Sequence, residues 1–406
     1  MTPAESHADS AIVAATPRSR AAQVLLGFSL MLIAFNLRPL FASLSVLLPD
    51  IIEQTALSAA GAGYLTTLPV LCLGLFAPLA PRISQRMGPE RTLLIVLLFI
   101  TAGAAVRGLG DVYSLFIGST LAGAAIATGN VLLPSVVKRD FPRQAALMTG
   151  LYTMALCGGA ASGAAFTIPI TLFLDDSWRA GLAVWGLLGA LVALLWAPYA
   201  LRGKRPSRHA TQKVRGLWRD PLAWQVTFFM GLQSALAFCL IGWMAPILRD
   251  RGLPGIEAGL VVSISIMMQV VTCLLVPPLA VRCKDQRLFN VVLAFIATLA
   301  FMGLLFAPLS TVWAWAVLQG IGQGGLFAIA MTMIVLRSPD SLIAAELSGM
   351  AQGVGYVLAA FGPLLVGLLR DATGGFAASA WLFAALGLGV AFSGWGAGRT
   401  LFVKAT

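Results

Sequence analysis

The stretch LMLIAFNLRPLFASLSVLLP, residues 30–49, is almost wholly apolar and carries one full charge, Arg38. A helix that crosses a membrane needs about 20 mostly apolar residues, and this stretch supplies that length. A charged side chain in the middle of such a helix costs at least a few kcal/mol, so it normally faces protein or water and binds a partner. The stretch therefore predicts a membrane-spanning helix and raises the question of what Arg38 binds.

Apolar runs of the same kind recur along the whole chain, which is 59% hydrophobic and only 11% charged. Soluble domains contain about 25% charged residues, so a water-facing globule is excluded. Helices are expected because lipid forces every backbone polar group to be satisfied within its own segment, and the alternating pattern of a membrane β-barrel is absent. We expect twelve transmembrane helices, at residues 21–49, 57–81, 91–110, 112–137, 144–174, 179–201, 221–248, 256–281, 287–308, 311–336, 342–369 and 375–401.

The net charge of +11 indicates topology and gives no support to nucleic-acid binding. If the first tail is cytoplasmic, 21 of the 27 basic residues fall in tails and loops on that side, and 5 fall on the other. Those five are Arg107, Arg179, Arg249, Arg251 and Arg370. This asymmetry follows the positive-inside rule. We expect an inner (plasma) membrane protein with both termini in the cytoplasm and with the lipid bilayer as a partner.

The polar residues form none of the clusters that enzymes or metal sites require. The five cysteines are scattered, the only histidines are His7 and His209, and no paired carboxylates lie at membrane depth. We therefore expect no disulfide, metal, cofactor or enzymatic activity. The segment GIGQGG, residues 320–325, lies inside an apolar run without the flanking strand and Lys-Ser/Thr of a phosphate-binding loop. Transport would then depend on gradients or exchange.

Two halves are indicated by the longest polar break, which follows the sixth expected helix. We expect a cytoplasmic tail at 1–20, a six-helix bundle at 21–201, a cytoplasmic loop at 202–220, and a second six-helix bundle with a short tail at 221–406. The segments MTGLYTMALCGG (148–159) and LSGMAQGVGYVL (347–358) match at an offset of 199. Internal repeats of this kind are typical of transporters that rock about a midplane site. The alternative is that two glycine-rich helices resemble one another by composition alone.

Several segments together resemble the cyanate and nitroimidazole transporter family of the major facilitator superfamily. They are FNLRPLFASLSVLLPDI (35–51), GNVLLPSVVKRDFP (129–142), DPLAWQVTFF (220–229), IGWMAPIL (241–248), KDQR (284–287) and LSGMAQGVGY (347–356). The resemblance covers nearly the whole chain. It implies an all-α integral membrane protein of twelve helices in two six-helix pseudo-repeat bundles, the major facilitator fold. It also implies a central cavity lined mainly by the first, fourth, seventh and tenth helices, with contributions from the second, fifth, eighth and eleventh.

The resemblance also implies a cytoplasmic gating loop between the second and third helices. In PRISQRMGPER, residues 81–91, the superfamily's pattern is matched by Arg86, Gly88 and Arg91, but Gln85 stands where an acidic residue is usual. The counterpart in the second half, LAVRCKDQR at 279–287, retains Asp285. A gating salt bridge from the first-half loop is therefore in doubt.

Arg38 has no carboxylate at membrane depth to pair with. Of the 16 acidic residues, 15 fall in tails, loops or the ends of expected helices, and only Glu346 lies slightly inside one. An arginine without a resident counterion suits a site whose counterion is the ligand, and its planar donors match small oxyanions. The alternative is a structural arginine bound to carbonyl groups. For Glu346 the two interpretations are a proton carrier and a solvated residue near a helix N-terminus, where the dipole favours an anion.

The remaining candidates for substrate binding are neutral polar or aromatic side chains inside the expected helices. Asn36 and Arg38 would lie roughly 200° apart on a continuous helix, so only one would face the cavity centre. For the amides the alternative role is interhelical hydrogen bonding, and for Trp243 it is an interfacial anchor. The other candidates are Asn130, Tyr152, Gln233, Gln319, Gln323, Gln352 and Tyr356. The glycine pairs spaced by four in GGAASG (158–163) and GMAQG (349–353) predict close helix packing.

These observations predict a monomeric secondary transporter for a small-molecule substrate, an anionic or polar solute such as cyanate. The runner-up is an efflux transporter for nitroimidazole-like drugs, which the resemblance equally allows. A membrane sensor with a transporter fold is a distant third, because such a protein would be expected to carry a soluble signalling domain.

Overall fold

The computed structural model describes residues 20–55, 57, 59–175, 177–202 and 214–405. Within these residues every regular element is a helix, and twelve segments are long and apolar enough to cross a membrane. The predicted fold class is thereby confirmed. The expected tail at 1–20 and most of the expected loop at 202–220 lie outside the described residues.

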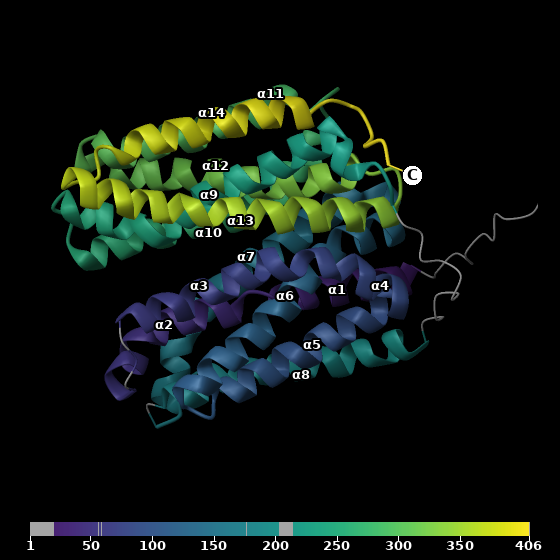
Figure 1. The fold of residues 1–406 in the computed structure, drawn as a ribbon, viewed down its shortest axis with the longest axis horizontal. Coiled ribbons are helices and arrows are strands. Elements are labelled where there is room, and N and C mark those ends of the chain that lie inside the picture. Colours follow the sequence, from purple (N-terminus) through teal and green to yellow (C-terminus); the bar gives the residue numbers. More distant parts are fainter. Residues whose placement is uncertain (1–19, 56, 58, 176, 203–213, 406) are drawn as a thin grey trace, which may run out of the picture.

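The first bundle contains the helices up to α8 and is drawn in purple to teal in Figure 1. Its elements are α1 (Arg20–Asn36), α2 (Pro39–Gln54), α3 (Ala59–Phe76), η1 (Ala77–Leu79), α4 (Ala80–Met87), α5 (Pro89–Arg107), α6 (Val112–Asp140), η2 (Pro142–Gln144), α7 (Ala145–Phe173) and α8 (Trp178–Arg202). Two expected helices differ from this. The segment predicted at 21–49 is broken into α1 and α2, and the one predicted at 57–81 continues through a 3₁₀ turn to Met87.

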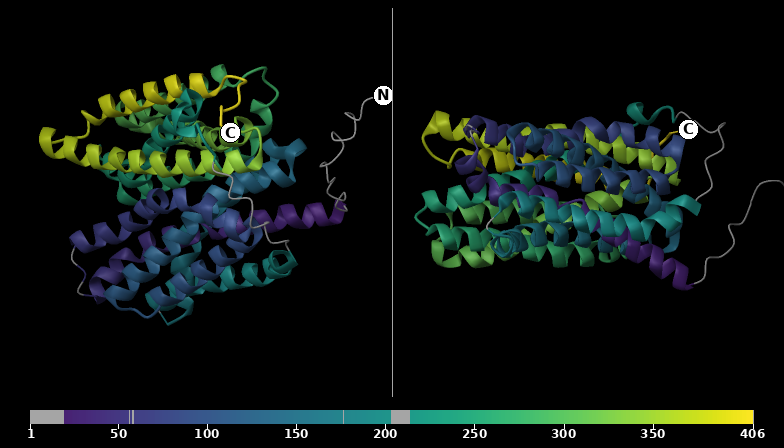
Figure 2. Two further views of the ribbon diagram at one scale, coloured as in Figure 1. Left: turned by 45° about the vertical axis from the view of Figure 1, so that its right-hand side comes forward. Right: turned by 90° about the horizontal axis from the view of Figure 1, so that it is seen from below.

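The second bundle contains the remaining helices, drawn in green to yellow. Its elements are η3 (Leu217–Arg219), α9 (Pro221–Asp250), α10 (Gly255–Ala280), α11 (Arg287–Phe306), η4 (Leu309–Thr311), α12 (Val312–Leu336), α13 (Ser341–Thr373) and α14 (Ser379–Ala397). The two bundles lie against each other at the end where α4 and the C-terminus are found, and they diverge toward the opposite end (Figures 1 and 2).

Both predicted glycine pairs pack as expected, one within a bundle and one between bundles. A Cβ at Gly159 would lie 2.1 Å from the Phe35 carbonyl oxygen, and one at Gly163 would lie 2.8 Å from Pro39. These glycines therefore let α7 lie directly against the break between α1 and α2. On α13, Gly349 lies beside Pro81 and Gly353 beside Pro78. This second pair brings the two bundles together where their ends meet.

The interior of the first bundle holds an arginine that the sequence analysis placed in a loop. Arg107 is the last residue of α5, and only 1% of it is exposed. Its Nε donates to Ser119 Oγ at 3.0 Å, and its Nη1 donates to the Leu40 carbonyl at 2.7 Å. The expectation of a loop arginine was wrong, because an arginine at a helix end can turn inward when backbone carbonyls and hydroxyls accept its donors.

Candidate functional site

Arg38 lies at a break in the first transmembrane segment. Pro39 has no N–H to donate to the carbonyl of Phe35, and its ring disfavours helical geometry at the preceding residue. Helix α1 accordingly ends at Asn36, Arg38 adopts φ −121°, and α2 begins at Pro39. The N-terminus of a helix carries a partial positive charge. The guanidinium and the start of α2 therefore place two sources of positive potential at one point within the first membrane segment.

This break corrects the assumed relation between Asn36 and Arg38. The angle of roughly 200° between them applies to a continuous helix, and the helix stops between the two residues. The side-chain amide of Asn36 donates to the Leu32 carbonyl of its own helix at 2.9 Å, and Asn36 is 1% exposed. Asn36 thus binds the end of its own helix, whereas the Arg38 guanidinium lies against Phe327 and Tyr356 of the second bundle.

The second bundle supplies the surroundings of the Arg38 guanidinium. The centre of the guanidinium lies 5.8 Å from the centre of the Phe327 ring on α12, within cation–π range. It also interacts electrostatically with the Tyr356 hydroxyl on α13 and with the thiols of Cys157 and Cys273. Within the described part of the chain, Arg38 forms no ion pair with a carboxylate.

Most of the other predicted site residues present buried polar atoms that have no partner in the protein. Buried polar groups are normally hydrogen-bonded, so such atoms indicate contact with a ligand or water. They come from both bundles, and each lies on a helix that the resemblance assigns to the cavity. The atoms are both amide atoms of Asn130, both of Gln319, the amide oxygens of Gln323 and Gln352, and the hydroxyl of Tyr152.

Some of these residues also join helices to one another. Gln352 donates from Nε2 to the Asn130 carbonyl at 3.1 Å and so connects α13 of the second bundle with α6 of the first. Gln323 donates to Gln233 Oε1 at 3.2 Å between α12 and α9. Gln233 itself donates to Ser234 at 2.8 Å, which satisfies its amide. Gln233 therefore has the helix-joining role that the sequence analysis considered as its alternative.

Trp243 likewise contacts protein groups within the second bundle. Its indole N–H donates to the Pro363 carbonyl at 2.8 Å, and its ring lies 5.8 Å from that of Phe376. A Cβ at Gly367 would meet the Trp243 ring at 3.1 Å. These contacts hold α9 against α13, so Trp243 acts as a packing residue between two helices.

The gating loop forms a hydrogen bond through Gln85, at the position where the superfamily pattern usually has an acidic residue. Gln85 Nε2 donates to Glu346 Oε1 at 3.2 Å across the two bundles. Glu346 is half-buried on the sixth residue of α13, whereas the helix cap is Asp340, which accepts from the Ile343 N–H at 2.9 Å. Glu346 therefore lies in the second turn of α13, half-buried and with a partner on the other bundle, and not at the helix N-terminus itself.

The other gating residues lie in the same loop or in its counterpart in the second half. Arg86 is exposed at the end of α4, Arg91 lies in the first turn of α5, and Gly88 joins these helices with a φ of 86° that favours glycine. Asp285 forms an ion pair with Arg287 at 3.6 Å in the second bundle.

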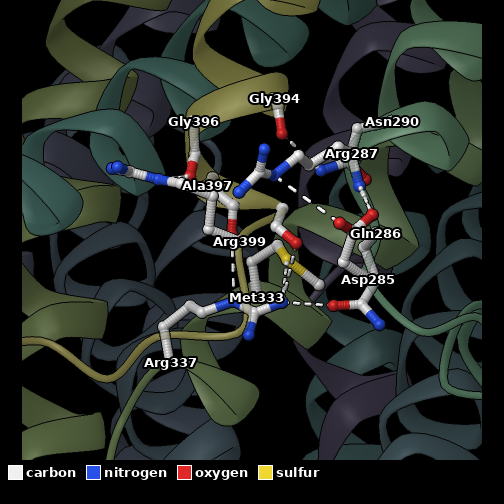
Figure 3. A network of polar contacts seen from close by, with 11 residues as sticks. Asp285, Gln286, Arg287, Asn290, Met333, Arg337, Gly394, Gly396, Ala397 and Arg399 are labelled. Atoms are coloured by element: carbon white, nitrogen blue, oxygen red, sulfur yellow. Dashed lines mark hydrogen bonds and ion pairs between the residues drawn. The ribbon is translucent and has the colours of Figure 1, made fainter.

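Asp285 also lies beside a buried arginine that holds the end of the second bundle together (Figure 3). Arg337 donates from Nε to the Ala397 carbonyl at 2.9 Å and from Nη2 to Gln286 Oε1. Burial lowers the pKa of Arg337 to about 10, and the negative charge of Asp285 opposes that shift. Arg337 thus stays charged at neutral pH and connects α12 with α14 and α11.

Phe327, Cys157 and Cys273 were not singled out from the sequence. Phe327 follows Gln323 by four positions, as Tyr356 follows Gln352, and residues four apart share a helix face. That spacing could have pointed to Phe327. The two cysteines come from different bundles, and no local pattern marks them.

Two six-helix bundles that meet around one guanidinium and a set of free polar atoms define a membrane transporter. The family model of the Major Facilitator Superfamily matches residues 24–318, and the chain belongs to this superfamily. It is a multi-pass membrane protein and not an enzyme.

Relatives and solved structures agree with this assignment. The chain is 38% identical over 383 residues to the 2-nitroimidazole transporter of Escherichia coli (strain K12), covering 93% of this chain and 96% of that protein. It is 30% identical over 358 residues to the cyanate transport protein CynX of the same organism, covering 88% and 92%. The proton:xylose symporter XylE superposes with a TM-score of 0.75 at 13% identity, covering 92% of this chain and 95% of that one, which supports the fold alone.

Proposed function

We propose that this chain moves a small anionic or polar solute, such as cyanate, across an inner membrane by alternating access, and that Arg38 binds the anion. The observation that carries this proposal is the position of Arg38 at the start of α2, with its guanidinium against Phe327 and Tyr356 of the second bundle. A broken helix whose N-terminus points at an anionic substrate group is a recurrent device of transporters. Here the guanidinium adds a permanent charge and planar donors at the same point.

The contacts between the bundles support the alternating-access part of the proposal. They join α13 to η1 and α4 through Gly349, Gly353 and the Gln85–Glu346 hydrogen bond. All of these contacts lie at the end of the molecule that carries the described C-terminus (Figure 1). If the positive-inside asymmetry sets the topology, this closed end faces the cytoplasm, and the diverging end faces outward.

A second candidate substrate is a nitroimidazole-like compound. Phe327 lies beside Arg38, and Phe238 lies 6.3 Å from the Tyr356 ring, so aromatic faces from three helices of the second bundle gather near the guanidinium. A flat heteroaromatic ring can stack on such faces, and its nitro group can accept from an arginine. The relative that is 38% identical carries the name of a 2-nitroimidazole transporter.

Ligand-dependent thermal stabilisation of the purified monomer would separate the two candidates. Any ligand that binds the folded state raises the melting temperature by mass action. We expect stabilisation by cyanate and related small anions and none in the Arg38→Ala variant. The control is Arg249→Ala, which removes an exposed arginine at the end of α9.

Stabilisation by nitroimidazoles alone would select the second candidate. Stabilisation of the Arg38→Ala variant by the same ligands, to the same degree, would contradict the role assigned to Arg38 under either candidate.

A further inference from the structure

Two cysteines from different bundles lie in contact close to Arg38. Cys157 on α7 and Cys273 on α10 have their sulfur atoms 3.7 Å apart, although 116 positions separate them in the sequence. Cys72 and Cys239 are buried elsewhere, and Cys283 is exposed. A disulfide has a sulfur–sulfur distance of about 2.05 Å, so side-chain rotation and a small shift of the helices would bring the pair to bonding distance.

The backbones of α7 and α10 are held close together beside this pair. A Cβ at Gly150 would lie 2.9 Å from the Leu274 carbonyl oxygen and 3.2 Å from that of Cys273. One turn further along, Thr153 Oγ1 donates to the Cys273 carbonyl at 3.4 Å. The close contact of the two thiols is therefore built into the packing of the bundles in this conformation.

The Arg38 guanidinium interacts electrostatically with both cysteines, and a cation beside a thiol is a feature of reactive cysteines. Cys157 is half-buried, whereas Cys273 is fully buried and directs its thiol to the Gly324 carbonyl at 3.4 Å. Cys157 is thus the more exposed residue of the pair, and Cys273 provides the second, resolving sulfur.

We propose that Cys157 and Cys273 form a peroxide-sensitive thiol pair whose oxidation joins the two bundles and arrests transport. The Cys157 thiolate attacks one oxygen of a hydroperoxide, the O–O bond breaks, and a sulfenic acid forms with release of water or an alcohol. The Cys273 sulfur then attacks the sulfenic sulfur, the S–O bond breaks, and the disulfide forms with release of water. Overall the two thiols lose two electrons and two protons, and the peroxide is reduced.

Such a bond would stop the transport cycle because alternating access separates the bundles at the end where they now touch. A link between α7 and α10 holds that end closed. Thiol reductants would cleave the bond and restore movement.

The test uses the full chain in liposomes with a protease site placed in the loop between α8 and α9. After treatment with hydrogen peroxide and cleavage, the two halves should remain joined on a non-reducing denaturing gel and separate after reduction. A non-reduced digest should contain the peptide pair that links Cys157 to Cys273. Cys157→Ser and Cys273→Ser should each abolish the link, and Cys283→Ser, which removes the exposed thiol, should retain it.

The functional consequence is measured on the same samples in two ways. Amide hydrogen exchange in the segments 81–91 and 337–346 should slow in the linked protein, and uptake of 2-nitroimidazole or cyanate should be lost and then return on reduction. The exchange measurement does not depend on the substrate, so an error in the proposed substrate would not obscure it. The proposal is overturned if peroxide that oxidises Cys283 leaves the halves separable, or if the linked protein exchanges and transports as the untreated protein does.

Discussion

The side-chain amide of Gln85 donates a hydrogen bond to Glu346 Oε1 at 3.2 Å, and this contact joins α4 of the first bundle to α13 of the second. The superfamily pattern expects an acidic residue at position 85, and a carboxylate there would face a second carboxylate. The chain instead places a neutral donor opposite Glu346, so this contact between the bundles is a hydrogen bond and not an ion pair.

Exchanging Gln85 for Glu should weaken this closed end. Two carboxylates at hydrogen-bond distance repel each other by on the order of 1 kcal/mol or more in a partly hydrated site. Spin labels at the loop residues Arg86 and Lys284 should report a longer distance in the Gln85→Glu variant at neutral pH. The distance should return toward that of the parent at acidic pH, where one carboxyl is protonated. An unchanged distance would show that the Gln85–Glu346 contact does not help to close this end.

The Glu346→Gln variant should keep substantial transport with nearly unchanged pH dependence. A glutamine oxygen can accept from Gln85 as the carboxylate does, so the contact between the bundles survives. Substrate flux into proteoliposomes, measured with and without a pH gradient, tests this prediction of unchanged transport. If the pH gradient drives accumulation in the parent protein but no longer does so in the variant, Glu346 carries the proton and this prediction is wrong.

Two adjacent glycines on α7 provide a matched pair of substitutions. A Cβ at Gly159 would lie 2.1 Å from the Phe35 carbonyl oxygen, whereas one at Gly158 would have its nearest neighbour at 3.9 Å. Gly159→Ala should destabilise the protein by about 1–3 kcal/mol through overpacking, and Gly158→Ala should be neutral or stabilise it by up to about 1 kcal/mol. Thermal unfolding in detergent would show the difference. Equal melting temperatures would mean that α7 does not rest on the break at Arg38.

Much of the fold follows from the sequence because membrane insertion leaves few alternatives. The apolar runs, the charge asymmetry and the polar break predicted twelve segments in two halves, and the structure confirms the twelve helical segments and both bundles. The break at Pro39 was predictable from the chemistry of proline, but the length of the apolar run from 21 to 49 concealed it. The inward turn of Arg107 was not predictable, because a charged residue at the end of an apolar run is equally typical of a loop.

The sequence predicted individual residues of the candidate site but not how they are arranged in space. Arg38, Tyr152 and Tyr356 could be selected because polar groups are rare in apolar helices. Which of the polar side chains retain free atoms depends on packing between helices far apart in the sequence, as the hydrogen bond from Gln323 to Gln233 shows. For the same reason the two cysteines near Arg38 gave no signal, and only the spacing from Gln323 could have pointed to Phe327.

The buried network around Arg337 should be important for the stability of the second bundle. Arg337→Ala removes the hydrogen bonds that the Ala397 carbonyl and Gln286 Oε1 accept and leaves these buried acceptors unpaired, at a cost of about 1–3 kcal/mol for each. Arg287→Ala is the matched control, because its ion pair with Asp285 is half-exposed, and such pairs contribute about 0–1 kcal/mol. Thermal unfolding measures the stability of the two variants. If the Arg337→Ala variant melts at the same temperature as the Arg287→Ala variant, the structural role of Arg337 is contradicted.

The membrane topology can be tested by direct labelling of introduced cysteines. The charge asymmetry predicts a cytoplasmic loop at 202–219 and an external end for α13. In a cysteine-free background, Ala372→Cys should react with an impermeant maleimide on intact cells, whereas Ser207→Cys, which lies outside the described residues, should react only after the membrane is opened. Labelling of the Ser207→Cys variant from outside would reverse the orientation.

The most direct test of the account is the ligand affinity of Arg38 variants, measured by titration calorimetry with the ligand that stabilises the parent protein. Hydrogen bonds to a charged group are worth about 1.5–3 kcal/mol, so Arg38→Ala should weaken binding by roughly 10-fold to 100-fold or more. The unliganded variant should still insert and fold. Arg38→Lys should also bind poorly, because a point charge does not reproduce the planar donors of arginine, and Arg249→Ala should bind normally. Affinity of the Arg38→Ala variant close to that of the parent would show that Arg38 is structural and contradict the proposed binding site.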